Sequence, residues 1–76
     1  MKDEVIAILT ELRPEFDFTE DVNYIEQGML DSFDVVSLVD SLDEKYNISI
    51  SGLDIIPENF SSVEAIIRTL EKNKKK

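Results

Sequence analysis

Apolar residues recur at helical spacing in three separate segments of this chain, and no other feature limits its possible folds as strongly. The three sets are Val5, Ile8, Leu9 and Leu12; Val35, Leu38, Val39, Leu42 and Tyr46; and Val63, Ile66, Ile67 and Leu70. A spacing of three and four residues places each set on one face of an α-helix. The pattern therefore predicts amphipathic helices over residues 3–12, 32–46 and about 62–72, packed through their apolar faces.

Polar residues at the ends of these segments predict where the helices begin and end. Asp31 is a favoured N-cap residue, because its carboxylate can accept a hydrogen bond from the backbone N–H of Asp34. Asn47 can end the same helix in a left-handed conformation. Ser61 and Glu64 have the spacing of a capping box, which would open the last helix.

The connections between these helices are expected to be irregular. Residues 14–30 show no clean period, and their apolar side chains could pin the segment to the helical core. Gly28 is expected in a backbone conformation that other residues resist. Between residues 48 and 60, Ser51 can open a short helix that Pro57 shortens or distorts.

The expected fold is all-α, a small four-helix bundle with three longer helices and a short third helix. A chain of 76 residues is the size of one domain, and such a chain buries only about 60% of its unfolded surface. We expect this single domain to span residues 1–72. Residues 73–76 are expected to form a disordered basic tail.

The composition argues against catalysis by the chain itself. Cysteine is absent, so the chain has no thiolate. Histidine is also absent, and it is the commonest metal ligand and the commonest general base near neutral pH. We therefore expect neither an enzyme nor a metal site.

The charge balance indicates which partners the chain can bind. It carries 17 acidic and 8 basic residues, a formal net charge of −9. Such a charge favours basic protein surfaces and disfavours nucleic acid and anionic lipids. No apolar run approaches the roughly 20 residues that span a membrane, and no segment has the pattern of a signal peptide. We expect a cytoplasmic monomer.

Ser32 follows the predicted N-cap and lies in the first turn of the second helix. Unpaired backbone N–H groups and the positive end of the helix dipole converge at such a position. An anionic group on the Ser32 hydroxyl oxygen would therefore be favourably placed, and a phosphate is the obvious candidate.

Two stretches resemble the acyl carrier protein family. They are Asp31-Ser32-Phe33 with the apolar stripe behind it, and Pro57-Glu58-Asn59-Phe60-Ser61-Ser62-Val63-Glu64-Ala65-Ile66. In that family the serine of an Asp-Ser-Leu motif carries 4′-phosphopantetheine, whose terminal thiol holds acyl groups as thioesters. The resemblance implies that a phosphopantetheinyl transferase moves this arm from coenzyme A to Ser32. It also implies that Asp31 can interact with that transferase or its metal.

The resemblance suggests roles for two further groups of residues. A polar, acidic face of the second helix would dock the basic surfaces of enzymes that load or transfer the acyl group: Asp34, Ser37, Asp40, Ser41 and Glu44. An acyl-binding cleft beside the short third helix would involve Ile55, Ile56 and Phe60. Both groups also have a purely structural interpretation, as a solvated face and as core packing.

The cargo and one alternative function remain open at this point. Phe33 replaces the family's usual leucine, and Asp40 stands where fatty-acid carriers tend to have an apolar residue. The pattern Gly-x-Leu-Asp-Ser is similar to D-alanyl carrier proteins of teichoic acid modification and to carriers of specialised lipid or polyketide pathways. An acidic helical adaptor that is never modified would have the same composition and periodicity.

Overall fold

The computed structural model describes residues 2–73 of the chain. It contains three α-helices, which are α1 (Lys2–Leu12), α2 (Ser32–Tyr46) and α3 (Val63–Lys72). Two short 3₁₀ helices, η1 (Gly52–Asp54) and η2 (Pro57–Phe60), lie between α2 and α3. No strand occurs within residues 2–73, so the expected all-helical class is confirmed. None of the helices in this part of the chain is long and apolar enough to cross a membrane.

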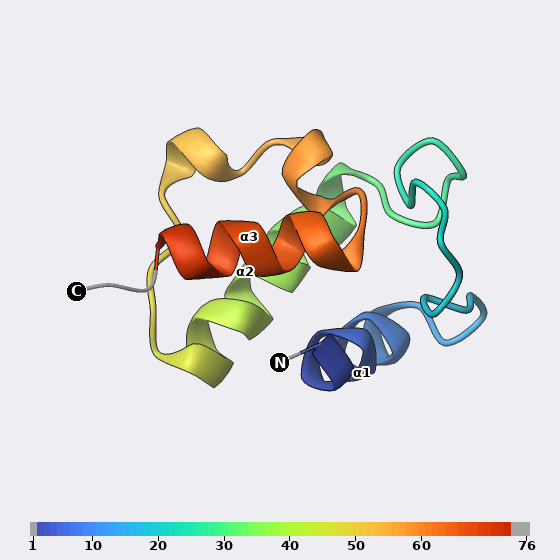
Figure 1. Cartoon of the computed structure of the whole chain (residues 1–76), viewed down its shortest axis with the longest axis horizontal. Coiled ribbons are helices and arrows are strands. Elements are labelled where there is room, and N and C mark those ends of the chain that lie inside the picture. The colour runs from blue at the N-terminus through green and yellow to red at the C-terminus, as the bar shows by residue number, and fades with distance from the viewer. Residues whose placement is uncertain (1, 74–76) are drawn as a thin grey trace.

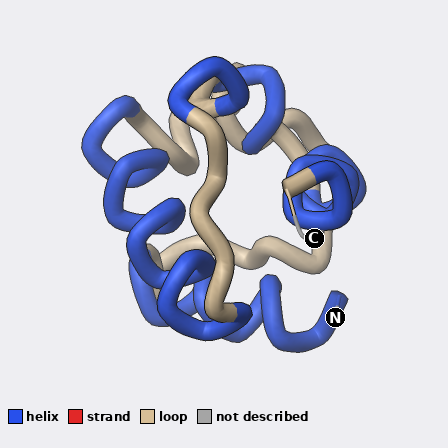
Figure 2. Tube along the Cα trace, turned by 90° about the vertical axis from the view of Figure 1, so that its left-hand side faces the viewer, coloured by secondary structure: helices blue, strands red, loops and turns tan. Residues whose placement is uncertain are grey.

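The helices enclose one apolar core. α1 packs against both α2 and α3, and η2 packs against α2 and α3 from the other side. Figure 1 shows η1 and η2 above α3, and Figure 2 shows the helical segments arranged around a common centre. All residues of the three predicted stripes belong to this core, either buried or packed against it. The predicted use of these apolar faces is therefore confirmed.

The long connection between α1 and α2 is pinned by side chains, as the sequence suggested. Its buried residues are Phe18, Tyr24, Met29 and Leu30. The Tyr24 hydroxyl donates to the carbonyl of Phe18 at 2.6 Å, and its N–H donates to the carbonyl of Ser61 at 2.8 Å. Gly28 has φ of 73°, in the left-handed region that other residues rarely adopt, and this confirms its expected role.

The expected short third helix is not a single helix. Pro57 begins η2, and the preceding residue, Ile56, is extended with φ of −128° and ψ of 151°. The ring of a proline disfavours helical geometry in the residue before it, so η1 cannot continue through this point. Two 3₁₀ turns therefore replace the short third helix of the expected four-helix bundle.

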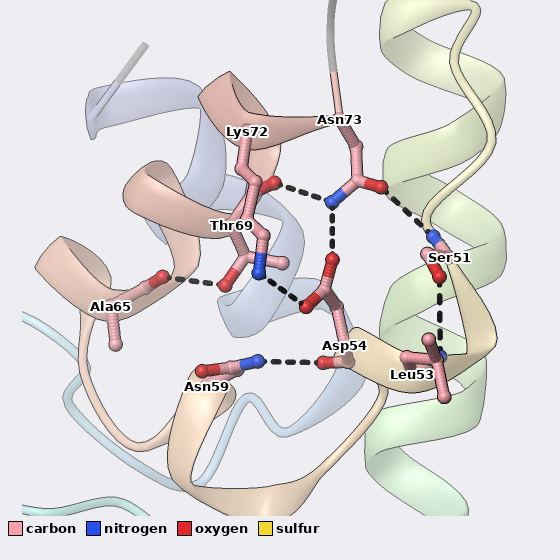
Figure 3. A network of polar contacts seen from close by, with 8 residues as sticks. All are labelled: Ser51, Leu53, Asp54, Asn59, Ala65, Thr69, Lys72 and Asn73. Atoms are coloured by element: carbon pink, nitrogen blue, oxygen red, sulfur yellow. Dashed lines mark hydrogen bonds and ion pairs between the residues drawn. The ribbon is translucent and has the colours of Figure 1, made fainter.

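Asp54 fastens η1 to the end of α3 (Figure 3). Its carboxylate accepts hydrogen bonds from Lys72 Nζ at 2.8 Å and from the side-chain amide of Asn73 at 3.1 Å. The side-chain oxygen of Asn73 accepts from the N–H of Ser51 at 3.0 Å. Asn59 donates to the backbone carbonyl of Asp54 at 2.8 Å. Asp54 is buried, and the contacts from Lys72 and Asn73 satisfy its charged carboxylate.

Asn73 also bears on the expected basic tail. It is the C-cap residue of α3, and its contacts with Asp54 and Ser51 tie it to the fold. The remaining residues of the expected tail, 74–76, lie outside the described part of the chain.

The start of α3 differs from the prediction by one residue. The N-cap is Ser62, whose hydroxyl oxygen accepts from the N–H of Ala65 at 3.1 Å. Ser61 instead donates its hydroxyl to the carbonyl of Glu58 at 2.9 Å, which closes η2. The predicted capping box between Ser61 and Glu64 is therefore wrong, because the preceding 3₁₀ turn uses the first of the two serines.

Candidate functional site

The start of α2 is built by two reciprocal hydrogen bonds. The Asp31 carboxylate accepts from the N–H of Asp34, and the Asp34 carboxylate accepts from the N–H of Asp31, both at 3.0 Å. This arrangement confirms Asp31 as the N-cap. Ser32 lies between the two acids in the first helical turn and is exposed. An anion on its oxygen would lie at the positive end of a fifteen-residue helix.

Arg13 braces this capping box from the end of α1. Its Nε and Nη2 atoms lie 2.9 and 2.8 Å from one carboxylate oxygen of Asp34. Its Nη2 also lies 3.5 Å from a carboxylate oxygen of Asp31. Sequence reasoning missed this residue, although one signal was present: Arg13 is the only basic residue between Lys2 and Lys45. Its side chain therefore supplies a positive charge that offsets the negative charges of the two acids beside Ser32, Asp31 and Asp34.

The contacts of Arg13 shift the ionisation of the groups that it joins. Partial burial raises the pKa of Asp34, but the hydrogen bonds from Arg13 and Asp31 outweigh burial and lower this pKa below its ordinary value. The hydrogen bond to Asp34, together with its negative charge, raises the pKa of Arg13. Both groups are charged at neutral pH, so the pair is a persistent feature of the site.

The five residues predicted for partner docking are divided by the structure. Ser37, Asp40 and Glu44 are exposed on α2, on the same face as Phe33. Ser41 is half-buried in a groove between α1 and α2, where Glu4 and Glu11 also line the wall. The Asp34 side chain is only 13% exposed, and its contacts are internal. Asp34 is thus part of the capping box, and its carboxylate is occupied by these internal contacts.

Two apolar side chains stand beside Ser32 on the surface of α2. Phe33 is 84% exposed and Val36 is 55% exposed. Burying either side chain against another protein would remove apolar area from water. The sequence singled out Phe33 only as a departure from a motif and did not single out Val36. A signal was available, because both positions fall outside the apolar stripe of the same helix.

The three residues predicted for an acyl cleft have different surroundings. Phe60 is fully buried in the core, Ile55 is half-buried against it, and Ile56 is exposed. One hollow lies between α1 and α2, and another lies between α1, the long connection and the start of α3. Neither of these two hollows is lined by Ile55, Ile56 or Phe60.

These features define a class of protein. An exposed serine lies at the capped start of a helix on a small helical scaffold, and the exposed face of that helix is both apolar and acidic. This arrangement suits a domain that is modified at the serine and then presented to other proteins. The chain matches the phosphopantetheine attachment site family over residues 3–70. It therefore belongs to that family, and the resemblance to acyl carrier proteins is confirmed.

Relatives with assigned names agree with this membership. The chain is 37% identical to the acyl carrier protein of Wolinella succinogenes over 71 residues, covering 93% of this chain and 90% of that protein. It is 35% identical to the D-alanyl carrier protein of Bacillus cereus strain B4264, covering 92% of this chain and 91% of that protein. It is 31% identical to the D-alanyl carrier protein of Staphylococcus saprophyticus, covering 92% of both chains. No solved structure matches the chain.

Proposed function

We propose that this protein carries acyl or aminoacyl groups as thioesters on a 4′-phosphopantetheine arm attached to Ser32. The observation that carries the proposal is the exposure of Ser32 between the two capping acids of α2, within the family match over residues 3–70. The relatives named as carrier proteins support a function of presentation and not of catalysis. The chemistry at the thiol belongs to the arm and to partner enzymes.

The attachment reaction uses only the hydroxyl of this chain. The Ser32 oxygen attacks the phosphorus that bears the pantetheine in coenzyme A. A new P–O bond forms, and the P–O bond to adenosine 3′,5′-bisphosphate breaks. The hydroxyl proton passes to a base of the transferase or to water, and the product on Ser32 is a phosphodiester. Its negative charge lies near the N-terminal N–H groups of α2, which favour it.

Partner enzymes would dock on the exposed face of α2. We name this face the docking stripe and define it by Phe33, Ser37, Asp40 and Glu44. Asp40 and Glu44 suit basic surfaces, and Phe33 suits an apolar pocket beside the modified serine. The partners proposed are a phosphopantetheinyl transferase, a loading ligase and acyl-transferring enzymes. A cytoplasmic location and a monomeric state remain predictions of the sequence.

A D-alanyl carrier is the second candidate, because relatives of that name match 92% of this chain, against 93% for the acyl carrier protein. Loading assays on the modified protein separate the two cargoes: a D-alanine ligase would charge a D-alanyl carrier, and an acyl ligase would charge a fatty or specialised carrier. For a long acyl chain, the cleft beside Ile55, Ile56 and Phe60 remains a prediction. Phe60 is part of the core, so such a cleft would require η2 to move away from α2.

An intact mass measurement tests the proposal directly. The protein is incubated with coenzyme A, magnesium and a broad-specificity phosphopantetheinyl transferase, after its starting mass has been recorded. We expect the unmodified protein to gain one phosphopantetheine and the Ser32→Ala variant to gain none. Ser49→Ala is the matched control, because it removes another exposed serine that lies outside the docking stripe and should leave loading intact. An unmodified protein that gains nothing would instead favour the acidic adaptor.

A further inference from the structure

We propose that Arg13 is a positioning residue for the loading of Ser32, acting through Asp34 and Asp31. The inference rests on the proposed function, since it concerns how the chain prepares Ser32 for the transferase. The residue to which this role is assigned lies just after α1, whereas the reaction takes place at the start of α2. Arg13 and Asp34 are 21 residues apart in the sequence.

The geometry of Arg13 connects it to both acids of the capping box. One Asp34 oxygen accepts hydrogen bonds from Nε of Arg13 and from the backbone N–H of Asp31, and Nη2 of Arg13 forms an ion pair with the same oxygen. The Arg13 Nη2 atom is shared between this oxygen, at 2.8 Å, and an Asp31 oxygen, at 3.5 Å. Because these two acids bracket Ser32, the guanidinium fixes both sides of the turn that presents the hydroxyl. A planar guanidinium is well suited to such a fork of contacts.

The charge of Arg13 matters as much as its geometry. Coenzyme A brings a diphosphate to Ser32, and this diphosphate would meet the carboxylates of Asp31 and Asp34. Like charges at a few ångströms repel, most strongly where water is partly excluded. The Asp34 side chain is 13% exposed, and the Arg13 side chain is 35% exposed. Arg13 therefore neutralises a partly buried carboxylate beside Ser32, and this reduces the repulsion between that carboxylate and the incoming diphosphate.

The other acid near Arg13 contributes less to this arrangement. Glu15 lies 3.4 Å from Nη1 of Arg13, and its side chain is 54% exposed. An exposed pair of this kind is weak and screened by salt. The contacts that bear on Ser32 are thus the ones to Asp34 and Asp31.

Steady-state kinetics of loading test the inference. The variants Arg13→Gln and Arg13→Lys are compared with the unchanged protein as substrates of the transferase. We expect Arg13→Gln to lower kcat by roughly ten- to a hundredfold, the size of effect that a small misplacement of a reacting group produces. KM for the carrier should not rise, because this variant is more acidic and keeps the docking stripe. Arg13→Lys, which retains the charge but cannot make the same set of contacts, should recover only part of kcat.

Two controls separate this role from a structural one. Arg68→Gln removes an exposed arginine of α3 with the same change of charge, and it should leave kcat unchanged. In the double variant Arg13→Gln/Asp34→Asn, the carboxylate that Arg13 neutralises is gone. If Arg13 acts through Asp34, this double variant loads at least as fast as Arg13→Gln. Circular dichroism is recorded for each variant, so that rates are compared only between folded proteins.

The outcomes are distinguishable from those of the proposed function. If the unchanged protein gains no phosphopantetheine, or if Ser32→Ala still gains it, the proposed function fails. If the unchanged protein is loaded and Arg13→Gln has a kcat within twofold of it, only the role of Arg13 is overturned. A double variant that loads more slowly than Arg13→Gln also overturns this role, as does a rise in KM without a change in kcat.

Discussion

Four consecutive residues at the start of α2 divide into an outer pair that forms the cap and an inner pair that does not. The carboxylates of Asp31 and Asp34 accept hydrogen bonds from each other's backbone N–H groups, and both also contact Arg13. Ser32 and Phe33, which lie between them, are exposed. The turn is therefore held by the outer pair of residues, while the inner pair is available to a partner. A site of this kind can be modified without disturbing the contacts that form it.

Phe33 should contribute to docking but not to stability. At 84% exposure its truncation removes few internal contacts, so Phe33→Ala should change the free energy of unfolding by less than about 0.5 kcal/mol. We expect KM for the transferase to rise several-fold, with kcat little changed. Leu53→Ala is the matched control, because Leu53 is 89% exposed on η1 and lies outside the docking stripe.

Salt separates the apolar part of the docking stripe from its acidic part. The effect of Asp40→Asn on KM should shrink as salt rises, since exposed charges are screened beyond about 8 Å at physiological ionic strength. The effect of Phe33→Ala should persist in salt. Equal KM values for Phe33→Ala, Leu53→Ala and the unchanged protein would remove Phe33 from the docking stripe.

At the scale of elements, periodicity and caps predicted the long helices well. α2 runs from Ser32 to Tyr46, its N-cap is Asp31, and Asn47 ends it with φ of 55°. These features depend on residues close in sequence, which is why the sequence alone could indicate them. The place of Ser32 in the first turn of α2 could be predicted for the same reason, because it depends on one local cap.

Features that depend on distant partners were not predicted. Arg13 reaches Asp34 across the long connection, and Asp54 reaches Lys72 from η1. The geometry of the segment between α2 and α3 depends on such contacts and on Pro57, so it does not follow from an apolar period. The residues suggested for an acyl cleft belong to that segment, and for this reason the sequence did not decide which of them are buried.

The cap of α3 gives an element-scale prediction. Ser62 accepts from the N–H of Ala65, so Ser62→Ala should destabilise the protein by about 1 kcal/mol, as the loss of an N-cap does. Ser61→Ala loses only the hydrogen bond to the Glu58 carbonyl at the end of η2, and its effect should be smaller. Urea unfolding of both variants measures the difference. The reverse order would mean that the helix begins at the capping box that the sequence suggested.

At the scale of the whole molecule, polar contacts join segments that are far apart in sequence. The Tyr46 hydroxyl donates to Glu4 at 2.7 Å and so joins α2 to α1. Arg13 joins α1 to the start of α2, and Asp54 joins η1 to the end of α3. Each of these contacts uses a carboxylate of a strongly acidic chain as an acceptor. Protonating these carboxylates should therefore weaken the contacts that join α1 to α2 and η1 to α3.

Asp54 allows this coupling between protonation and folding to be measured. Hydrogen bonds from Lys72 and Asn73 lower its pKa below the ordinary value of 3.8. A carboxyl group whose pKa is lower in the folded state than in the unfolded state stabilises the fold above its unfolded pKa. This stabilisation is lost as the pH falls below about 4, through the folded pKa. Asp54→Asn should thus be less stable than the unchanged protein at pH 7, and the difference should narrow toward pH 3.

Urea unfolding at a series of pH values, with the midpoint recorded for both proteins, measures this narrowing. Asp40→Asn is the matched control, since it removes one exposed negative charge from α2 without touching the contacts of Asp54. A difference between Asp54→Asn and the unchanged protein that is the same at pH 7 and pH 3 would contradict the prediction. It would mean that the Asp54 contacts hold η1 in place equally well without the charge, so that acid must act on the molecule through other carboxylates.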